Sequence, residues 1–83
     1  MNEAGVRNAI NRKLKQNKGT FEVSKAMVFR ELGIDGCDWR LLNKVIGDLG
    51  EGDKVVVEQT ANRIKFTNAD LSLNGVVPST TPV

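Results

Sequence analysis

The sequence predicts a small α+β domain in which three helices precede a C-terminal β-hairpin. Two segments repeat apolar residues at helical spacing, and the segment between them is apolar on nearly all sides. From residue 54 onward the pattern changes to the β-branched, alternating composition that is typical of strands. Because a chain of 83 residues buries only about 60 to 65% of its unfolded surface, it has room for one core and so for one domain.

The first helix is predicted over residues 3–17, with Gly19 as a stop signal. Apolar residues recur every four positions and fall on one stripe of this helix: Val6, Ile10 and Leu14. A separate face is basic and polar, and it includes Arg12 and Lys15. One face of the helix is therefore expected to pack in the core, and another to carry positive charge.

The next segment, residues 20–23, alternates apolar and polar side chains over a short length, so it is either a short strand or an extended connector. A second helix is predicted over residues 25–32, with Ser24 as its N-cap and Gly33 as the left-handed residue that ends it. Because this helix is apolar nearly all round, we expect it to be buried. Two of its large side chains are expected in the core: Met27 and Phe29.

A third helix is predicted to begin at a cap supplied by Asp35 or Asp38 and to end near Leu49. Apolar side chains occupy one side of its helical wheel: Trp39, Leu42, Val45, Ile46 and Leu49. Other residues share an arc of roughly 100° on the opposite side: Arg40, Asn43, Lys44 and Gly47. This helix is therefore expected to present one face to the core and the other to solvent.

The hairpin is predicted from two strands, residues 55–58 and 63–67, joined by a short loop. Apolar side chains of the second strand point to one face: Ile64 and Phe66. Polar side chains of the same strand point to the other face: Arg63, Lys65 and Thr67. Glu58 is expected to pair across the strands with one of the two cations on that face.

Residues 68–83 are predicted to form a tail, because they are short on charge and, near their end, rich in Ser, Thr, Asn and Pro. We expect its last eight or so residues to be disordered. Its apolar residues could dock on a neighbouring subunit: Leu71, Leu73, Val76 and Val77. The predicted domain therefore spans residues 1–67.

The net charge of +2 is unevenly distributed along the chain. Residues 1–18 have five basic side chains and one acidic, residues 19–53 have four basic and seven acidic, and residues 54–67 have three basic and one acidic. Two basic segments therefore flank an acidic middle. They form a surface for a polyanion if the fold brings them to one side, and solvated charge otherwise.

Histidine is absent and Cys37 is the only cysteine, so sites that need a histidine base or a cluster of thiolates lack an obligatory part. We expect no enzymatic activity, no catalytic residue, no metal site and no cofactor. Cys37 is interpreted as a packing residue, with an interchain disulfide as the alternative. The sequence has neither a span of about 18 apolar residues nor a signal-peptide pattern, so we expect a cytoplasmic protein.

The order of these elements resembles the winged helix-turn-helix family of DNA-binding domains. The resemblance covers residues 3–67 and is carried by the run RELGIDGCDWRLLNKVIGDLG, residues 30–50, followed by KVVV, residues 54–57. It implies that the hairpin is the wing and that the third helix is the recognition helix. A small β-barrel of the OB or SH3 type is a weaker alternative, because too few strands remain to close one.

The resemblance implies a protein that binds double-stranded DNA, in transcriptional control or another DNA transaction, and that would be nucleoid-associated. A homodimer is expected whether or not the chain binds DNA, because a core of about 65 residues is marginal alone, and the small size predicts no small-molecule ligand. Arg40 and Asn43 would reach base edges, since arginine suits guanine and asparagine suits adenine, while Lys44 meets the phosphate backbone. A second set would contact the phosphate backbone or, from the wing, the minor groove: Ser24, Lys25, Arg63 and Lys65. Arg12 and Lys15 either add phosphate contacts or lie on the far side as solvated charge.

An alternative function keeps the same fold without a DNA role. In it, a winged-helix module binds another protein through Leu41, Val56 and the apolar tail. The acidic middle of the chain favours this alternative.

Overall fold

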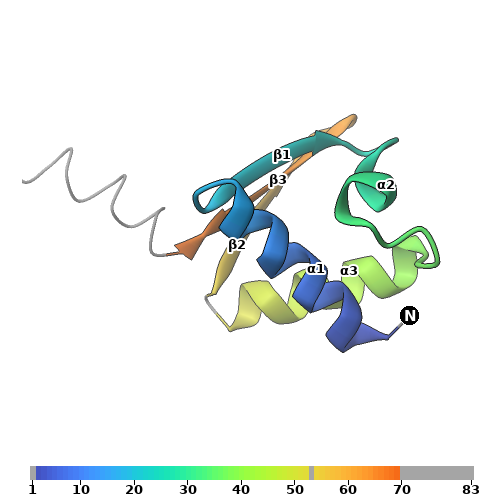
Figure 1. Ribbon diagram of the computed structural model, residues 1–83, viewed down its shortest axis with the longest axis horizontal. Coiled ribbons are helices and arrows are strands. Elements are labelled where there is room, and N and C mark those ends of the chain that lie inside the picture. The colour runs from blue at the N-terminus through green and yellow to red at the C-terminus, as the bar shows by residue number, and fades with distance from the viewer. Residues whose placement is uncertain (1, 53, 70–83) are drawn as a thin grey trace, which may run out of the picture.

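The structure is a computed structural model that describes residues 2–52 and 54–69 (Figure 1). The bounds of the elements are α1 Glu3–Gln16, β1 Thr20–Ser24, α2 Val28–Leu32, α3 Trp39–Glu51, β2 Val55–Gln59 and β3 Arg63–Asn68. Over these described residues the chain is a small α+β domain of three helices and one three-stranded antiparallel sheet, which is compatible with a winged helix. The strands form an open sheet, not the small β-barrel considered above.

Helix α1 begins and ends close to its predicted bounds. The side chain of Asn2 caps it by accepting a hydrogen bond from the backbone N–H of Gly5 at 2.9 Å. Lys18 at φ 61° and Gly19 at φ 93° then turn the chain through the left-handed region towards β1. The buried residues of α1 are those of the predicted stripe and its edge: Val6, Ala9, Ile10 and Leu14.

The last strand lies in the centre of the sheet. β3 pairs with β1 on one side and with β2 on the other, so the strand order is β1-β3-β2. Phe66 lies opposite Phe21 on β1, and the two rings stack with their centroids 6.2 Å apart. The sequence predicted either a strand or an extended connector at residues 20–23. These residues form part of a strand, which joins the N-terminal half of the chain to the hairpin.

The two faces of the sheet differ as the alternation predicts. The core face carries buried apolar side chains: Phe21, Val23, Val55, Ile64 and Phe66. The other face carries exposed and mostly charged side chains: Glu22, Val56, Glu58, Arg63 and Lys65. The helices pack against the core face, so the charged face of the hairpin is left to solvent.

Helix α2 begins three residues later than predicted, and Ser24 does not cap it. Ser24 is the last residue of β1, where it lies opposite Arg63, and the helix starts after Met27 without a side-chain cap. The backbone N–H of Lys25 donates to the carbonyl of Asn62 at 2.8 Å, so the hairpin loop holds the chain in a turn before the helix can begin. This long-range hydrogen bond is the reason that the local cap signal failed.

The shorter helix also corrects the expected core. Met27 was expected to be buried, but it lies before the helix and is 37% exposed. Val28 and Leu32 are the two buried residues of α2, whereas Phe29 packs only partly against the core. Gly33 ends the helix at φ 71°, as predicted.

Asp38, of the two aspartates considered, caps α3. Its Oδ1 accepts a hydrogen bond from the backbone N–H of Leu41 at 2.9 Å. The helix buries three residues of the predicted apolar side: Leu42, Val45 and Leu49. Trp39 lies at the edge of that side and packs edge-on against Phe29, with the ring centroids 5.1 Å apart. The start of α3 is therefore fixed against α2.

The core contains apolar side chains alone over the residues that the structure describes. No polar or charged side chain is buried there, so folding does not incur the desolvation penalty of an uncompensated charge. The most enclosed large side chains come from α1, the α2–α3 connection, α3 and β3: Ile10, Leu14, Ile34, Leu42, Ile64 and Phe66. Helix α1, the α2–α3 connection and the hairpin therefore share one core.

Asp38→Ala should lower the free energy of unfolding by about 1 kcal/mol, because the backbone N–H of Leu41 loses its acceptor and the helix dipole loses its anion. Asp35→Ala is the matched control, since Asp35 is an exposed aspartate in the same connection and caps nothing. Its effect should stay within about 0.5 kcal/mol. Urea denaturation of both variants measures this, and equal losses would mean that the cap contributes nothing.

Candidate nucleic-acid interface

The exposed face of α3 lies between two flanks that pack on other helices. Trp39 marks the flank that contacts α2, and Asp48 marks the flank that faces α1. Arg40 and Asn43 are exposed between these flanks, and so is Gly47. At 100° per residue, Arg40 and Gly47 lie about 20° apart and point away from the buried side of the helix. Two of the polar side chains predicted to read bases therefore stand clear of the core.

Gly47 has no internal reason to be a glycine. A Cβ added at this position would meet nothing within 4 Å, and its backbone is helical. Gly50, near the end of the same helix, is equally open. A glycine in the interior of a helix costs about 1 kcal/mol relative to alanine, so Gly47 weakens α3 without improving any packing that the structure describes.

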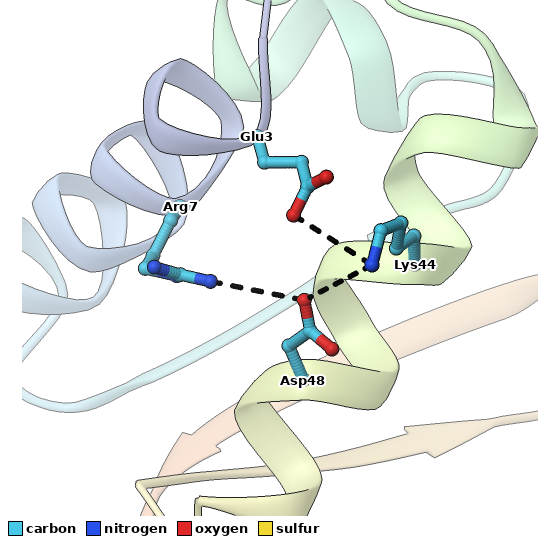
Figure 2. Close-up of polar contacts among 4 residues, drawn as sticks. All are labelled: Glu3, Arg7, Lys44 and Asp48. Carbon is cyan, nitrogen blue, oxygen red and sulfur yellow. Dashed lines mark ion pairs between the residues drawn. The ribbon is translucent and has the colours of Figure 1, made fainter.

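Lys44 belongs to a cluster of ion pairs that joins α3 to α1 (Figure 2). Its Nζ lies 3.8 Å from a carboxylate oxygen of Glu3 and 3.7 Å from one of Asp48, which in turn lies 3.8 Å from the guanidinium of Arg7. The side chain of Lys44 remains 58% exposed. Because the four charges sum to zero, this flank of α3 attracts phosphate less than an isolated lysine would.

Arg40 has a different environment. Among the residues that the structure describes, no carboxylate lies within ion-pair distance of its guanidinium, and the side chain of Asn43 makes no hydrogen bond. Their donors and acceptors are directed to solvent. These two side chains are consequently available to a ligand without first breaking a contact within the protein.

Ser24 and Lys25 do not lie at the start of a helix, as the expected phosphate site required. Both are partly buried, and the backbone N–H of Lys25 is already bonded to Asn62. Helix α2 has five residues, so its dipole is small. Of the expected phosphate site, only the side chain of Lys25 is left as a donor. The backbone of this residue lies beside the hairpin loop.

The two cations of the hairpin have acidic neighbours. The Nε of Arg63 donates to a carboxylate oxygen of Glu22 at 3.2 Å, so its partner is on β1. Of the two cations considered for Glu58, the register places Lys65 opposite it and not Arg63. Lys65 lies opposite Glu22 on β1 and opposite Glu58 on β2. Cross-strand neighbours of opposite charge reduce the field that these cations offer to an external phosphate.

Arg12 and Lys15 are exposed on α1, as predicted. Arg12 also lines a groove between α1 and α2, to which Arg30 contributes from the opposite wall. Sequence reasoning did not select Arg30, and it did not find the acidic partners of the cations: Glu3, Glu22 and Asp48. The spacing of Lys44 and Asp48, four residues apart on one helix, could have identified that pair, whereas Glu3 and Glu22 depend on which elements the fold brings together.

The features expected of a protein interface fall in different places. Leu41 packs partly against the core, whereas Val56 is 40% exposed on the solvent face of the sheet. The predicted tail lies outside the described residues from position 70 onward, and β3 ends at Asn68, one residue beyond the predicted domain boundary.

The thiol of Cys37 is partly buried and donates to the carbonyl of Asp38 at 3.2 Å. Desolvation, and then the negative charge of Asp38, raise the pKa of this thiol above its ordinary value, so it is protonated at neutral pH. Over the described ranges, no group of three or more His, Cys, Asp or Glu side chains could hold a metal ion. Within the same ranges, no helix is long and apolar enough to cross a membrane.

Comparison of the chain with protein-family models, with curated proteins and with solved structures finds no match.

Proposed function

We propose that this chain binds double-stranded DNA as a winged helix-turn-helix protein, with α3 as the helix that enters the major groove. The order of the elements supports this, because a helix, a strand, two helices and a hairpin follow one another as the resemblance requires. The sheet order β1-β3-β2 supports it too, since it sets the hairpin beside the helical part of the domain as a short wing.

The observation that carries the proposal is the exposed face of α3. It combines Arg40 and Asn43, whose polar groups have no partner among the described residues, with Gly47, which packs against nothing. No contact within the described part of the protein requires a glycine at this exposed position. The close approach of another molecule to the helix backbone would require one. The edges of base pairs in the major groove are such a surface.

The side chains on this arc suit direct readout of bases. Arginine can donate two hydrogen bonds to O6 and N7 of guanine, and asparagine can bond N6 and N7 of adenine. Arg40 and Asn43 are three positions apart, so they lie on neighbouring turns of one helical face. They would therefore contact neighbouring base pairs.

The phosphate contacts are fewer than the count of basic residues suggests. Lys44 and Arg63 are ion-paired, and Lys65 has two acidic cross-strand neighbours without an ion pair to either. Lys25 and Arg40 make no ion pair among the described residues. Lys25 lies beside the hairpin loop, where it would meet the flanking backbone. Affinity would then depend more on α3 than on a broad basic surface.

As a function, we propose a small transcriptional regulator or another DNA-transaction factor that acts as a homodimer. A core of about 65 residues is marginal for stability, and the exposed Val56 offers apolar surface that a second subunit would cover. In a two-fold symmetric dimer, the two copies of α3 would read two half-sites of the DNA.

A second candidate is a module that binds another protein and not DNA. The exposed Val56 and the acidic neighbours of the wing cations favour it. The salt dependence of binding separates the two candidates.

Binding to duplex DNA should weaken steeply with salt. If Lys25, Lys44 and Lys65 each neutralise one phosphate, the logarithm of the affinity should fall against the logarithm of the salt concentration with a slope of about −3 per protomer. Fluorescence anisotropy of a labelled duplex at several salt concentrations measures the slope. A flat response, or no binding at low salt, would remove the proposal and leave the protein-binding module.

Arg40→Ala should cost roughly 1 to 3 kcal/mol of binding free energy on the preferred sequence, and much less on unrelated duplexes, because it removes a base contact. Lys65→Ala is the comparison, since it should weaken all sequences alike and by less, its charge being balanced by Glu22 and Glu58. The preferred duplex is first selected from a randomised pool with the natural protein. Equal losses on every sequence for Arg40→Ala would make this side chain a backbone contact.

Gly47→Ala should stabilise the fold and weaken DNA binding at the same time. The methyl group raises helix propensity by about 1 kcal/mol and meets nothing in the protein, but it would stand where the duplex approaches α3. We expect a higher melting temperature and a loss of affinity of about tenfold or more.

Gly50→Ala is the matched control for Gly47→Ala, because Gly50 is equally open and lies near the end of the helix, away from the residues that enter the groove. It should stabilise the protein similarly and change the affinity less than about threefold. If Gly47→Ala binds the duplex as tightly as the natural protein, the duplex does not approach the backbone of α3 closely at Gly47, and this part of the proposal is wrong.

A further inference from the structure

We propose that the groove between α1 and α2 binds an acidic segment of a partner protein through Arg12 and Arg30. This surface is separate from the exposed face of α3, and the proposal does not rest on DNA binding. The groove has a volume of about 200 Å³ and lies between the C-terminal half of α1 and the end of α2.

The groove has an apolar floor and charged walls. Ala9 and Leu32 are the apolar residues that line it, and they are 2% and 5% exposed. Arg12 stands on the α1 wall and Arg30 on the α2 wall. Because these two residues are almost fully buried, they expose little surface, and a ligand in the groove meets mainly polar and charged side chains, with a guanidinium from each helix.

One acidic residue lies in the groove, and it already has a partner. The carboxylate of Glu31 is 4.0 Å from the Nζ of Lys13, and this ammonium also lies 5.3 Å from the centroid of the Phe21 ring. Lys13 and Glu31 thus balance each other. Arg12 and Arg30 have no carboxylate within ion-pair distance among the described residues, so two like charges share one hollow without a counterion.

A carboxylate placed between the walls would supply the missing counterion to both arginines. Guanidinium groups bind carboxylates through paired, charge-assisted hydrogen bonds, and they lose little water in doing so. A peptide that presents acidic side chains fits this feature, with their methylene groups lying along the walls.

Duplex DNA fits this groove less well. A duplex is rigid and convex, so it cannot fill a hollow of about 200 Å³ between two helices. A protein side chain can enter the groove, whereas the DNA backbone can only pass over it.

The test uses the full chain, labelled with ¹⁵N, and a synthetic peptide of four Glu-Ala-Leu repeats as the probe. Amide shifts on addition of the peptide should concentrate in residues 9–16 and 30–33 and spare the exposed face of α3. The same peptide with glutamine for glutamate should produce no shifts. No shifts with the acidic peptide, or shifts mainly on α3, would overturn the proposal.

A pair of double variants separates the groove from general attraction between charges. Arg12→Gln with Arg30→Gln should weaken binding of the acidic peptide about tenfold or more. Lys15→Gln with Lys54→Gln removes the same amount of positive charge from exposed positions that do not line the groove, and should weaken binding less than about threefold. Equal losses in the two variants would overturn the proposal.

Titration with a mixed-sequence duplex completes the experiment. If the Arg12 and Arg30 variant loses duplex affinity while its peptide affinity is unchanged, the groove is a nucleic-acid contact and the proposal fails. The far-ultraviolet circular dichroism spectrum verifies that the variants are folded, and the shift map of the natural protein does not depend on any variant.

Discussion

The fold depends on the central position of β3 in the sheet. Ile64 and Phe66, both fully buried, lie between β1 on one side and β2 on the other, so one strand joins residues 20–24 to residues 55–59 in a single sheet. The same pairing brings the hairpin loop to Lys25, where a backbone hydrogen bond delays the start of α2. A single strand thus sets the core, the length of a helix and the direction of the charged sheet face.

Acidic neighbours decide which of the basic residues can meet a ligand. Lys44 and Arg63 are among the cations held within 4.0 Å of a carboxylate. Lys44 pairs with Asp48 on its own helix and with Glu3 on α1, and Arg63 pairs with Glu22 on β1. Such exposed pairs contribute little to stability, but they lower the local potential. Arg40 and the two arginines of the α1–α2 groove have no such partner among the described residues. Both candidate surfaces are therefore built around cations that have no internal counterion in the part of the chain that the structure describes.

The sequence was sufficient where the signal was local. The apolar spacing of α1 and α3, the alternation of the hairpin and the cap at Asp38 were all predicted close to their observed positions. It failed at Ser24, because the competing hydrogen bond comes from Asn62, far along the chain. It also missed the partners of the cations, since Glu22 and Arg63 are 41 positions apart and meet only through the register of the sheet. The helical period predicted that the polar arc of α3 is exposed. It did not predict which cations of that arc are paired with carboxylates.

Helix α1 keeps the two candidate surfaces apart. Its Arg7 flank is bonded to Asp48 of α3, and its Arg12 flank lines the groove with α2. At 100° per residue these two side chains point about 140° apart around the helix. The buried stripe of α1, with Val6 fully enclosed, fixes the rotation of the helix, so neither flank can turn towards the other. A ligand in the groove would then leave the face of α3 free, and the domain could hold a protein segment and a duplex at once.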